Sequence, residues 1–216
     1  YNVIILEDDA YGGIDFEEGG LPLLKELDDS GFVIYLSSFS KNVYSGLRMG
    51  WIAADKRIIR EFSTCKQLTD LHSGSLSQWL VERFILSGGL DAHMKKICVE
   101  YRVRRDLALS ALGRFAPKGA VWNNPKGGYY IWCRLPEGLS ADSLIKKAAE
   151  YKVSFIPGTP FFSSGCGDDY IRLNFTYAPI NSIEEGIRLL CKAMKELTEL
   201  RTPDAYEHVT EVTPIV

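Results

Sequence analysis

A lysine in a serine-rich turn is the most reactive candidate in this 216-residue chain. Residues 37–50 read Ser-Ser-Phe-Ser-Lys-Asn-Val-Tyr-Ser-Gly-Leu-Arg-Met-Gly, and apolar runs precede them (Phe32 to Leu36) and follow them (Met49 to Ala54). A primary amine in a turn between two buried strands can form a Schiff base with a carbonyl compound. Arg48 adds a second positive charge, so we expect an anionic ligand that reacts with an amine. An ordinary loop lysine is the alternative interpretation of Lys41.

Three consecutive acids follow the first apolar run. Val3 to Leu6 predicts a strand buried on both faces, and Glu7-Asp8-Asp9 comes directly after it. Ligands of open α/β sheets bind at the carboxyl ends of strands, so one of these carboxylates can meet a protonated ring nitrogen. Because residues of an extended chain alternate in direction, Glu7 and Asp9 point one way and Asp8 the other, and all three acids remain candidates. Tyr11 adds a phenol, with simple packing as its alternative role.

One arginine interrupts a later apolar run, Ile171-Arg172-Leu173-Asn174-Phe175. A buried guanidinium needs an anionic partner, which is either a substrate carboxylate or an internal acid. The hydroxyls of Ser38 and Ser40, together with Arg48, suit a phosphate group. Combined with a reactive lysine, these residue types describe pyridoxal 5′-phosphate (PLP) and an amino acid.

Composition excludes several other classes. The chain is 46% hydrophobic and 25% charged, which is typical of a globular protein. Its net charge of −3 does not favour nucleic-acid binding, and we expect Arg102, Arg104 and Arg105 to form a solvated or interdomain face. No apolar run approaches the roughly 20 residues of a membrane span. The five cysteines are scattered without a C-x-x-C pair, which predicts reduced thiols of a cytoplasmic protein and no metal site.

The hydrophobic pattern predicts an α/β fold in two parts. Residues 1–100 combine buried strands with helices, and residues 101–200 form a small α+β domain that precedes a tail at 201–216. We expect the aromatic residues between Trp122 and Trp132 to lie in the core and on sheet faces. The predicted helices cover 56–68, 75–86, 90–113 and 140–151, and Ser182 is predicted to cap a final helix. In the helix at 56–68, we expect Asp55 to be the cap and Ile58, Ile59, Phe62 and Cys65 to point inward. The predicted strands of the second part cover 120–122, 129–135, 153–156 and 170–175.

Six motifs in a fixed order carry a family resemblance. They are Glu-Asp-Asp-Ala-Tyr (7–11), Ser-x-Ser-Lys-x-x-x-x-Gly-Leu-Arg-x-Gly (38–50), Tyr-Arg-x-Arg-Arg-Asp (101–106), Pro-x-Gly-Gly-Tyr (125–129), Pro-Gly-x-x-Phe (157–161) and Ile-Arg-Leu-Asn-Phe (171–175). The chain resembles the C-terminal part of a class I/II, fold-type I PLP-dependent aminotransferase. The most similar branch holds 2-aminoadipate and kynurenine aminotransferases and the aminotransferase-like domains of MocR regulators. The resemblance implies a remnant of the large-domain sheet followed by a small α+β C-terminal domain.

The resemblance also implies a role for each matching residue. Lys41 corresponds to the lysine that forms the Schiff base and then carries a proton between the substrate Cα and the cofactor. Asp8 corresponds to the carboxylate on the pyridine nitrogen, and Tyr11 to the phenol on the ring oxygen. The phosphate ligands of the family correspond to Ser38, Ser40 and Arg48. The arginine that holds the substrate α-carboxylate corresponds to Arg172. Where the family often has Ala-Pro, this chain has Tyr44-Ser45.

The function implied is transfer of an amino group between an amino acid and a 2-oxo acid by a homodimer, without metal, nucleic acid or membrane. A MocR-type regulator that senses an effector and another PLP reaction, such as C–S β-elimination, are the alternatives. Because the sequence starts without Met inside an apolar run, we expect the C-terminal part of a longer protein. The isolated chain is then expected to bind PLP poorly, to be inactive and to aggregate through an open sheet edge.

Overall fold

The computed structural model describes residues 3–17 and 20–200. The chain divides into two compact units, which are described one at a time: unit 1 is Tyr1–Glu100 with Lys126–Gly128, and unit 2 is Tyr101–Pro125 with Tyr129–Val216. The tail predicted at 201–216 lies outside the described residues.

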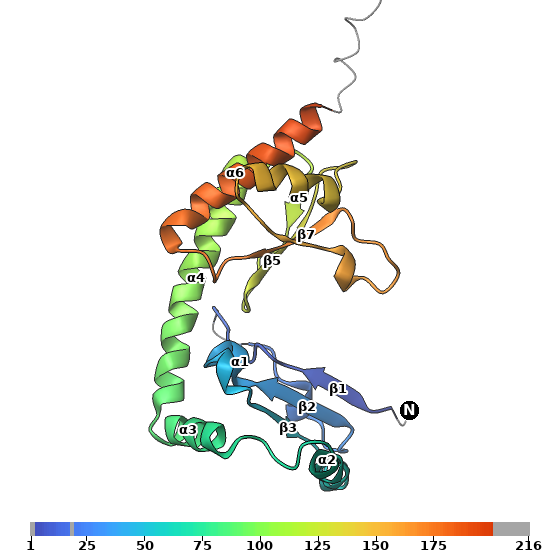
Figure 1. Ribbon diagram of the computed structural model, residues 1–216, viewed down its shortest axis with the longest axis vertical. Coiled ribbons are helices and arrows are strands. Elements are labelled where there is room, and N and C mark those ends of the chain that lie inside the picture. Colours follow the sequence, from blue (N-terminus) through green and yellow to red (C-terminus); the bar gives the residue numbers. More distant parts are fainter. Residues whose placement is uncertain (1–2, 18–19, 201–216) are drawn as a thin grey trace, which may run out of the picture. The chain divides into compact units, whose positions relative to one another are not determined.

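Unit 1 contains a three-stranded sheet in the order β1-β2-β3 (Figure 1). Strand β1 (Ile5–Asp8) runs parallel to β2 (Val33–Ser38), and β3 (Gly50–Ala53) runs antiparallel to β2. Residue pairs Asp8 with Leu36 and Ser38 with Gly50 fix the register at the ends of the strands. The carboxyl ends of β1 and β2 therefore lie side by side, as the sequence predicts for the acids and the lysine turn.

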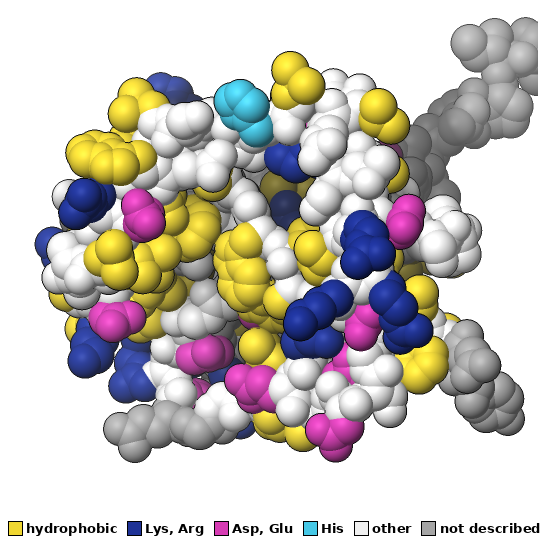
Figure 2. Space-filling model, turned by 90° about the horizontal axis from the view of Figure 1, so that it is seen from below, with side chains coloured by type: hydrophobic (Ala, Val, Ile, Leu, Met, Phe, Trp, Pro, Cys, Tyr) yellow, Lys and Arg dark blue, Asp and Glu magenta, His cyan; other side chains and the backbone are white. Residues whose placement is uncertain are grey.

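The prediction that the first strand is buried on both faces is wrong. Ile5 is 43% exposed and Leu6 is 65% exposed, whereas Val33, Ile34 and Tyr35 of β2 are buried. The difference arises because β1 is an outer strand of the sheet and β2 is the central one. Exposed apolar side chains also show as yellow areas in the surface view of Figure 2.

The helices predicted at 56–68, 75–86 and 90–113 are present, and the described part of unit 1 also has three short helical segments. In chain order, these elements are η1 (Leu24–Leu27), α1 (Phe39–Asn42), η2 (Ser45–Leu47), α2 (Lys56–Thr69), α3 (Ser75–Leu86) and the first part of α4 (Gly89–Phe115). Asp55 caps α2 as predicted, because its side chain accepts a hydrogen bond from the backbone N–H of Arg57. Phe62 and Cys65 were predicted to point inward from α2, but both are exposed. Among the described residues, no helix combines the length and hydrophobicity needed to cross a membrane.

Unit 2 contains a four-stranded antiparallel sheet in the order β4-β5-β7-β6. Its strands are β4 (Val121–Trp122), β5 (Tyr130–Arg134), β6 (Ile156–Pro157) and β7 (Tyr170–Asn174). Its other elements are the end of α4, α5 (Ala141–Glu150), η3 (Thr159–Phe161) and α6 (Ile180–Glu199). Alternate residues of β5 and β7 are buried, and the core includes Leu112, Leu144, Leu190 and Met194 from the helices.

Three expectations about unit 2 are wrong. The last helix begins at Ile180 after Pro179, so Ser182 lies inside it and does not cap it. Only the end of the strand predicted at 153–156 pairs, as the two-residue β6. For Arg105 the solvated alternative is wrong, because the residue is 6% exposed, its Nη1 donates to the carbonyl of Pro125 at 2.7 Å and its Nε donates to Oδ1 of Asp106 at 2.9 Å.

Candidate active site

The three acids at the end of β1 have different surroundings. Glu7 accepts hydrogen bonds from the backbone N–H groups of Leu24 and Lys25 at 2.7 and 2.8 Å. Asp9 accepts a hydrogen bond from the Tyr35 hydroxyl at 2.6 Å. The Asp8 side chain is exposed and makes no hydrogen bond or ion pair with any described residue. Asp8 is therefore the acid of the three that is available to a ligand.

The backbone explains this division of the acids. Asp8 pairs with Leu36 across β1 and β2, and Glu7 pairs with Tyr35. Since paired residues of neighbouring strands share a face, Glu7, Tyr35 and Asp9 point to one side of the sheet and Asp8 to the other. Ser38 lies two residues after Leu36 and shares the face of Asp8.

The lysine turn leaves the end of β2 as a short helix. The Ser38 hydroxyl accepts a hydrogen bond from the backbone N–H of Ser40 at 3.1 Å and thereby caps α1. Lys41 lies in this helix, is exposed, and has its Nζ 5.9 Å from the centroid of the Tyr11 ring. The structure thus brings the lysine beside the phenol that follows the acids.

Arg48 returns to the same turn from η2. Its Nη1 lies 3.4 Å from the Ser40 hydroxyl and 3.3 Å from the Ser45 carbonyl oxygen. Arg48 has φ 52° and ψ 41°, a left-handed conformation that is uncommon outside glycine and is often found at functional sites. The turn that carries Tyr44 and Ser45 in place of Ala-Pro therefore still directs the guanidinium towards Ser40. Ser38, Ser40 and Arg48 form a set of donors of the type that holds a phosphate group.

Arg172 lies in unit 2, on the face of the sheet opposite the core. Its neighbours Ile171 and Leu173 are buried, whereas Arg172 is half-buried and pairs with Trp132 across β5 and β7. Its guanidinium carbon is 4.0 Å from the centroid of the Tyr130 ring and 4.2 Å from that of Phe161. The Arg172 Nε is buried and has no hydrogen-bond partner among the described residues.

The sequence does not predict that Tyr130 and Phe161 lie against Arg172, or that Tyr35 binds Asp9. Tyr130 and Trp132 alternate with the buried Ile131 and Cys133, so the two-residue period separates them from the core. That these aromatic side chains share a face with Arg172 follows only from the register of β5 against β7, which the sequence does not determine. The bond from Tyr35 to Asp9 likewise depends on the pairing of β1 with β2.

Comparison with known proteins places the chain in a family. The family model of aminotransferases of class I and II matches residues 1–188. The chain belongs to this family. The family resemblance expected from the six motifs is confirmed, and so is the α/β fold.

Individual members of the family are similar over about half of their own length. Aromatic-amino-acid aminotransferase 1 of Thermococcus litoralis is 40% identical over 196 residues, which cover 91% of this chain and 47% of that protein. The crystal structure of LysN, an α-aminoadipate aminotransferase from Thermus thermophilus complexed with N-(5′-phosphopyridoxyl)-L-leucine, matches with a TM-score of 0.86 and 38% identity. That match covers 91% of this chain and 51% of LysN. The uncharacterized HTH-type transcriptional regulator YisV of Bacillus subtilis is 34% identical, with 89% of this chain and 40% of that protein covered.

Proposed function

We propose that this aminotransferase-family chain carries the lysine side of a PLP site and takes part in amino-group transfer between an amino acid and a 2-oxo acid. One observation carries the proposal: Lys41, Ser40 and Arg48 share one turn, and the Lys41 amine lies 5.9 Å from the centre of the Tyr11 ring. A reactive amine, a phosphate-type donor set and a phenol are thus combined in unit 1. These are the groups that a cofactor with an aldehyde, a phosphate and a ring hydroxyl requires.

The phosphate end of the cofactor would bind to Ser38, Ser40 and Arg48. Two hydroxyl groups and a guanidinium supply neutral and charged donors, and charged donors to phosphate make the stronger hydrogen bonds. The internal contact from Arg48 to Ser40 is long, at 3.4 Å, so this contact is weak and exchangeable for a phosphate oxygen.

The ring end of the cofactor would meet Asp8 and Tyr11. When bound, PLP supplies an electron sink for the negative charge that develops at the substrate Cα. Asp8 would pair with the protonated ring nitrogen, and its carboxyl group has no competing internal donor among the described residues. Tyr11 would form a hydrogen bond with the ring oxygen.

Lys41 has two tasks in this proposal. Its amine would hold the aldehyde carbon of PLP covalently. The Nζ of Lys41 would also take the proton from the substrate Cα and return a proton. Lys41 lies in the short helix α1 and is exposed, so its side chain is accessible to a ligand.

Arg172 of unit 2 would bind the α-carboxylate that amino acids and 2-oxo acids share. Its buried Nε, which has no hydrogen-bond partner in the described part of the chain, supports this role, since a buried charged donor favours an anionic ligand. We further propose a homodimer in the cytoplasm, and the five free cysteines are consistent with that compartment.

The direct test is a half-reaction with PLP-loaded protein at its natural length. Addition of an L-amino acid should convert the cofactor to its aminated form and release one equivalent of the matching 2-oxo acid. Lys41→Arg should abolish the conversion, and Lys56→Arg is the matched control at an exposed lysine. Release of ammonia in place of cofactor amination would support a β-eliminating enzyme and contradict the proposal.

The similarity to YisV supports a second candidate, an effector sensor within a regulator. In that case the same site would bind PLP and an amino compound, and the wild-type half-reaction would stop before 2-oxo acid release.

A further inference from the structure

The surroundings of Arg172 are unusual for an arginine because its guanidinium contacts aromatic rings, and no described acid pairs with it. Trp132 lies opposite Arg172 on β5, and Ile156 lies opposite it on β6. Arg172 forms no ion pair among residues 3–17 and 20–200. Asp169, which immediately precedes β7, is bound to Arg134 at 2.8 Å. The described part of the chain therefore supplies contacts to the faces of the guanidinium but no counter-charge.

Two rings make these face contacts. Tyr130 is the diagonal cross-strand neighbour of Arg172, because Trp132 is the residue directly opposite, and diagonal neighbours on one face are within reach of long side chains. Phe161 comes from η3, which follows β6. Both ring centroids lie within 4.2 Å of the guanidinium carbon, inside the range of about 6 Å for a cation–π contact. Tyr130 and Phe161 are called the aromatic clamp below.

The clamp is itself held in place. The Phe161 ring packs edge-on against Trp132 at 5.7 Å, and Trp132 stacks on Tyr170 at 5.4 Å with 16° between the ring planes. Gly158 permits this arrangement, since a Cβ at that position would lie 2.6 Å from the Gly167 carbonyl oxygen and 2.6 Å from the Tyr170 Cβ. The short turn between β6 and η3 thus brings Phe161 against the sheet.

We propose that Tyr130 and Phe161 are positioning residues that fix Arg172 for a carboxylate without neutralising its charge. The ring faces restrict the guanidinium by dispersion and cation–π attraction. They do not occupy its N–H groups, and the buried Nε has no hydrogen-bond partner among the described residues. An internal acid would position the guanidinium equally well, but a substrate carboxylate would then have to displace it. The clamp therefore makes the carboxylate of the substrate the counter-ion that Arg172 lacks. The carboxylate role of Arg172 rests on the proposed function, whereas the clamp is a property of the chain alone.

A lysine cannot replace the arginine in such a site. The planar guanidinium stacks on rings and presents several N–H groups in one plane, whereas an ammonium group is a compact charge without that plane. Arg172→Lys should therefore lose carboxylate binding although it keeps the positive charge.

The clamp can be tested without cofactor or turnover by NMR of the arginine Nε–Hε groups. Arg172→Lys identifies the Arg172 signal by its loss. Stacked rings should move the Arg172 Hε resonance away from that of exposed arginines, and Phe161→Leu or Tyr130→Leu should return it, while Tyr177→Leu at an exposed tyrosine should not. Sodium acetate should shift the signal in the wild type, and acetamide, which has the same shape and no charge, should not. An Arg172 signal at the exposed position, or an equal response to both probes, would overturn the inference.

Kinetics of the loaded protein separate positioning from a general loss of structure. Phe161→Leu should raise KM for the amino acid and for the 2-oxo acid by about 10-fold or more, with kcat changed by less than about 3-fold, and Phe161→Tyr should restore the wild-type KM. A fall in kcat of that same size, with no rise in KM, would contradict the clamp. If the NMR result holds and no half-reaction occurs, the proposed function fails and the clamp stands.

Discussion

The Tyr35 hydroxyl donates a 2.6 Å hydrogen bond to Oδ2 of Asp9. A second contact holds the same residue, because the Ser37 hydroxyl donates to the Asp9 backbone carbonyl at 2.9 Å. Gly12 leaves room for this arrangement, since a Cβ there would collide with the Asp9 carboxylate. Asp9 is therefore fixed on the Tyr35 side of the sheet, and the neighbouring Asp8 remains free on the other side.

Replacement of Tyr35 by phenylalanine tests how strongly this bond holds the end of β1. Hydrogen bonds to charged groups contribute about 1.5–3 kcal/mol, so Tyr35→Phe should lower the free energy of unfolding by that amount at pH 7. Burial, with help from the bond to Asp9, raises the pKa of Tyr35 to about 12 from 10.0. The folded state thus keeps a proton that the unfolded state loses, and the stability that Tyr35 contributes is complete below pH 10 and is lost as pH rises towards 12.

Urea denaturation between pH 7 and pH 11 measures both effects. The wild-type protein should lose stability above pH 10, and this loss should be smaller in Tyr35→Phe. Tyr44→Phe is the control, since Tyr44 is 66% exposed. Identical alkaline profiles of Tyr35→Phe and the wild type would contradict the role given to this bond.

Asp8→Asn should mainly lower kcat, whereas Asp9→Asn should mainly lower thermal stability. With the cofactor bound, Asp8 and the ring nitrogen would form a buried ion pair, and removing one member of such a pair costs about 3–5 kcal/mol. If most of this cost appears in the transition state, Asp8→Asn should slow kcat by about 10²–10³-fold or more. Because Asp8 is exposed and has no partner among the described residues, the thermal stability of the Asp8→Asn protein should equal that of the wild type. Asp9→Asn should lower the melting temperature and affect kcat less. A near-normal kcat for Asp8→Asn, measured with the cofactor bound, would falsify the assignment of Asp8 to the ring nitrogen.

The sequence predicts the strand ends and the lysine turn because these depend on local patterns. Apolar runs, Asp55 as a cap and the Ser-x-Ser-Lys spacing are all read within a few residues, and the structure has the corresponding elements. The choice among three acids could not be predicted, because it depends on Tyr35 and on the backbone of Leu24, each far from the acids in sequence. Burial of the first strand was predicted wrongly, since residue types do not show whether a strand is central or outer in its sheet.

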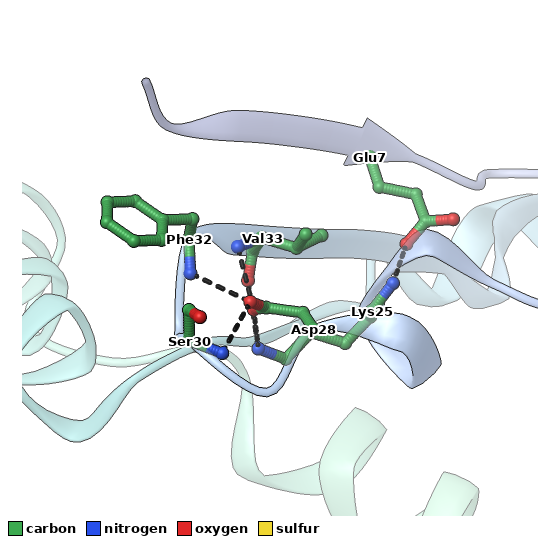
Figure 3. A network of polar contacts seen from close by, with 6 residues as sticks. All are labelled: Glu7, Lys25, Asp28, Ser30, Phe32 and Val33. Atoms are coloured by element: carbon green, nitrogen blue, oxygen red, sulfur yellow. Dashed lines mark hydrogen bonds and ion pairs between the residues drawn. The ribbon is translucent and has the colours of Figure 1, made fainter. Parts of the chain in front are cut away.

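A second network in unit 1 predicts acid sensitivity. The Asp28 carboxylate accepts hydrogen bonds from the backbone N–H groups of Ser30, Phe32 and Val33 and forms an ion pair with Lys25 at 3.0 Å (Figure 3). The backbone donors, Val33 first, hold the pKa of Asp28 well below its usual range. A depressed carboxyl pKa means that this stabilisation is present above about pH 4 and is lost as pH falls below that value.

Asp28→Asn should therefore lower the melting temperature at pH 7, and the difference from the wild type should shrink between pH 4 and pH 2. The neighbouring Asp29 is exposed, so Asp29→Asn serves as the control with the same change of charge. A constant difference between Asp28→Asn and the wild type across this pH range would show that the ionised carboxylate has no part in holding the loop.

Two glycine-to-alanine changes in unit 2 should act in opposite directions. A Cβ at Gly158 meets backbone and side-chain atoms at 2.6 Å, so Gly158→Ala should cost about 1–3 kcal/mol of stability and displace Phe161. Gly186 lies inside α6, and a Cβ there has no atom within 4 Å, so Gly186→Ala should add about 0.4–1 kcal/mol. Thermal denaturation compares the two variants, and a neutral Gly158→Ala would refute the close packing of η3 on the sheet.

The central claim is that Lys41 binds the cofactor covalently, and reductive trapping tests it most directly. The protein at its natural length is incubated with PLP, reduced with sodium borohydride and digested, and the modified peptide is located by mass spectrometry. We predict a stoichiometric phosphopyridoxyl group on Lys41 and none on the Lys41→Arg variant. Stoichiometric modification of another lysine, with Lys41 unmodified, would contradict the account.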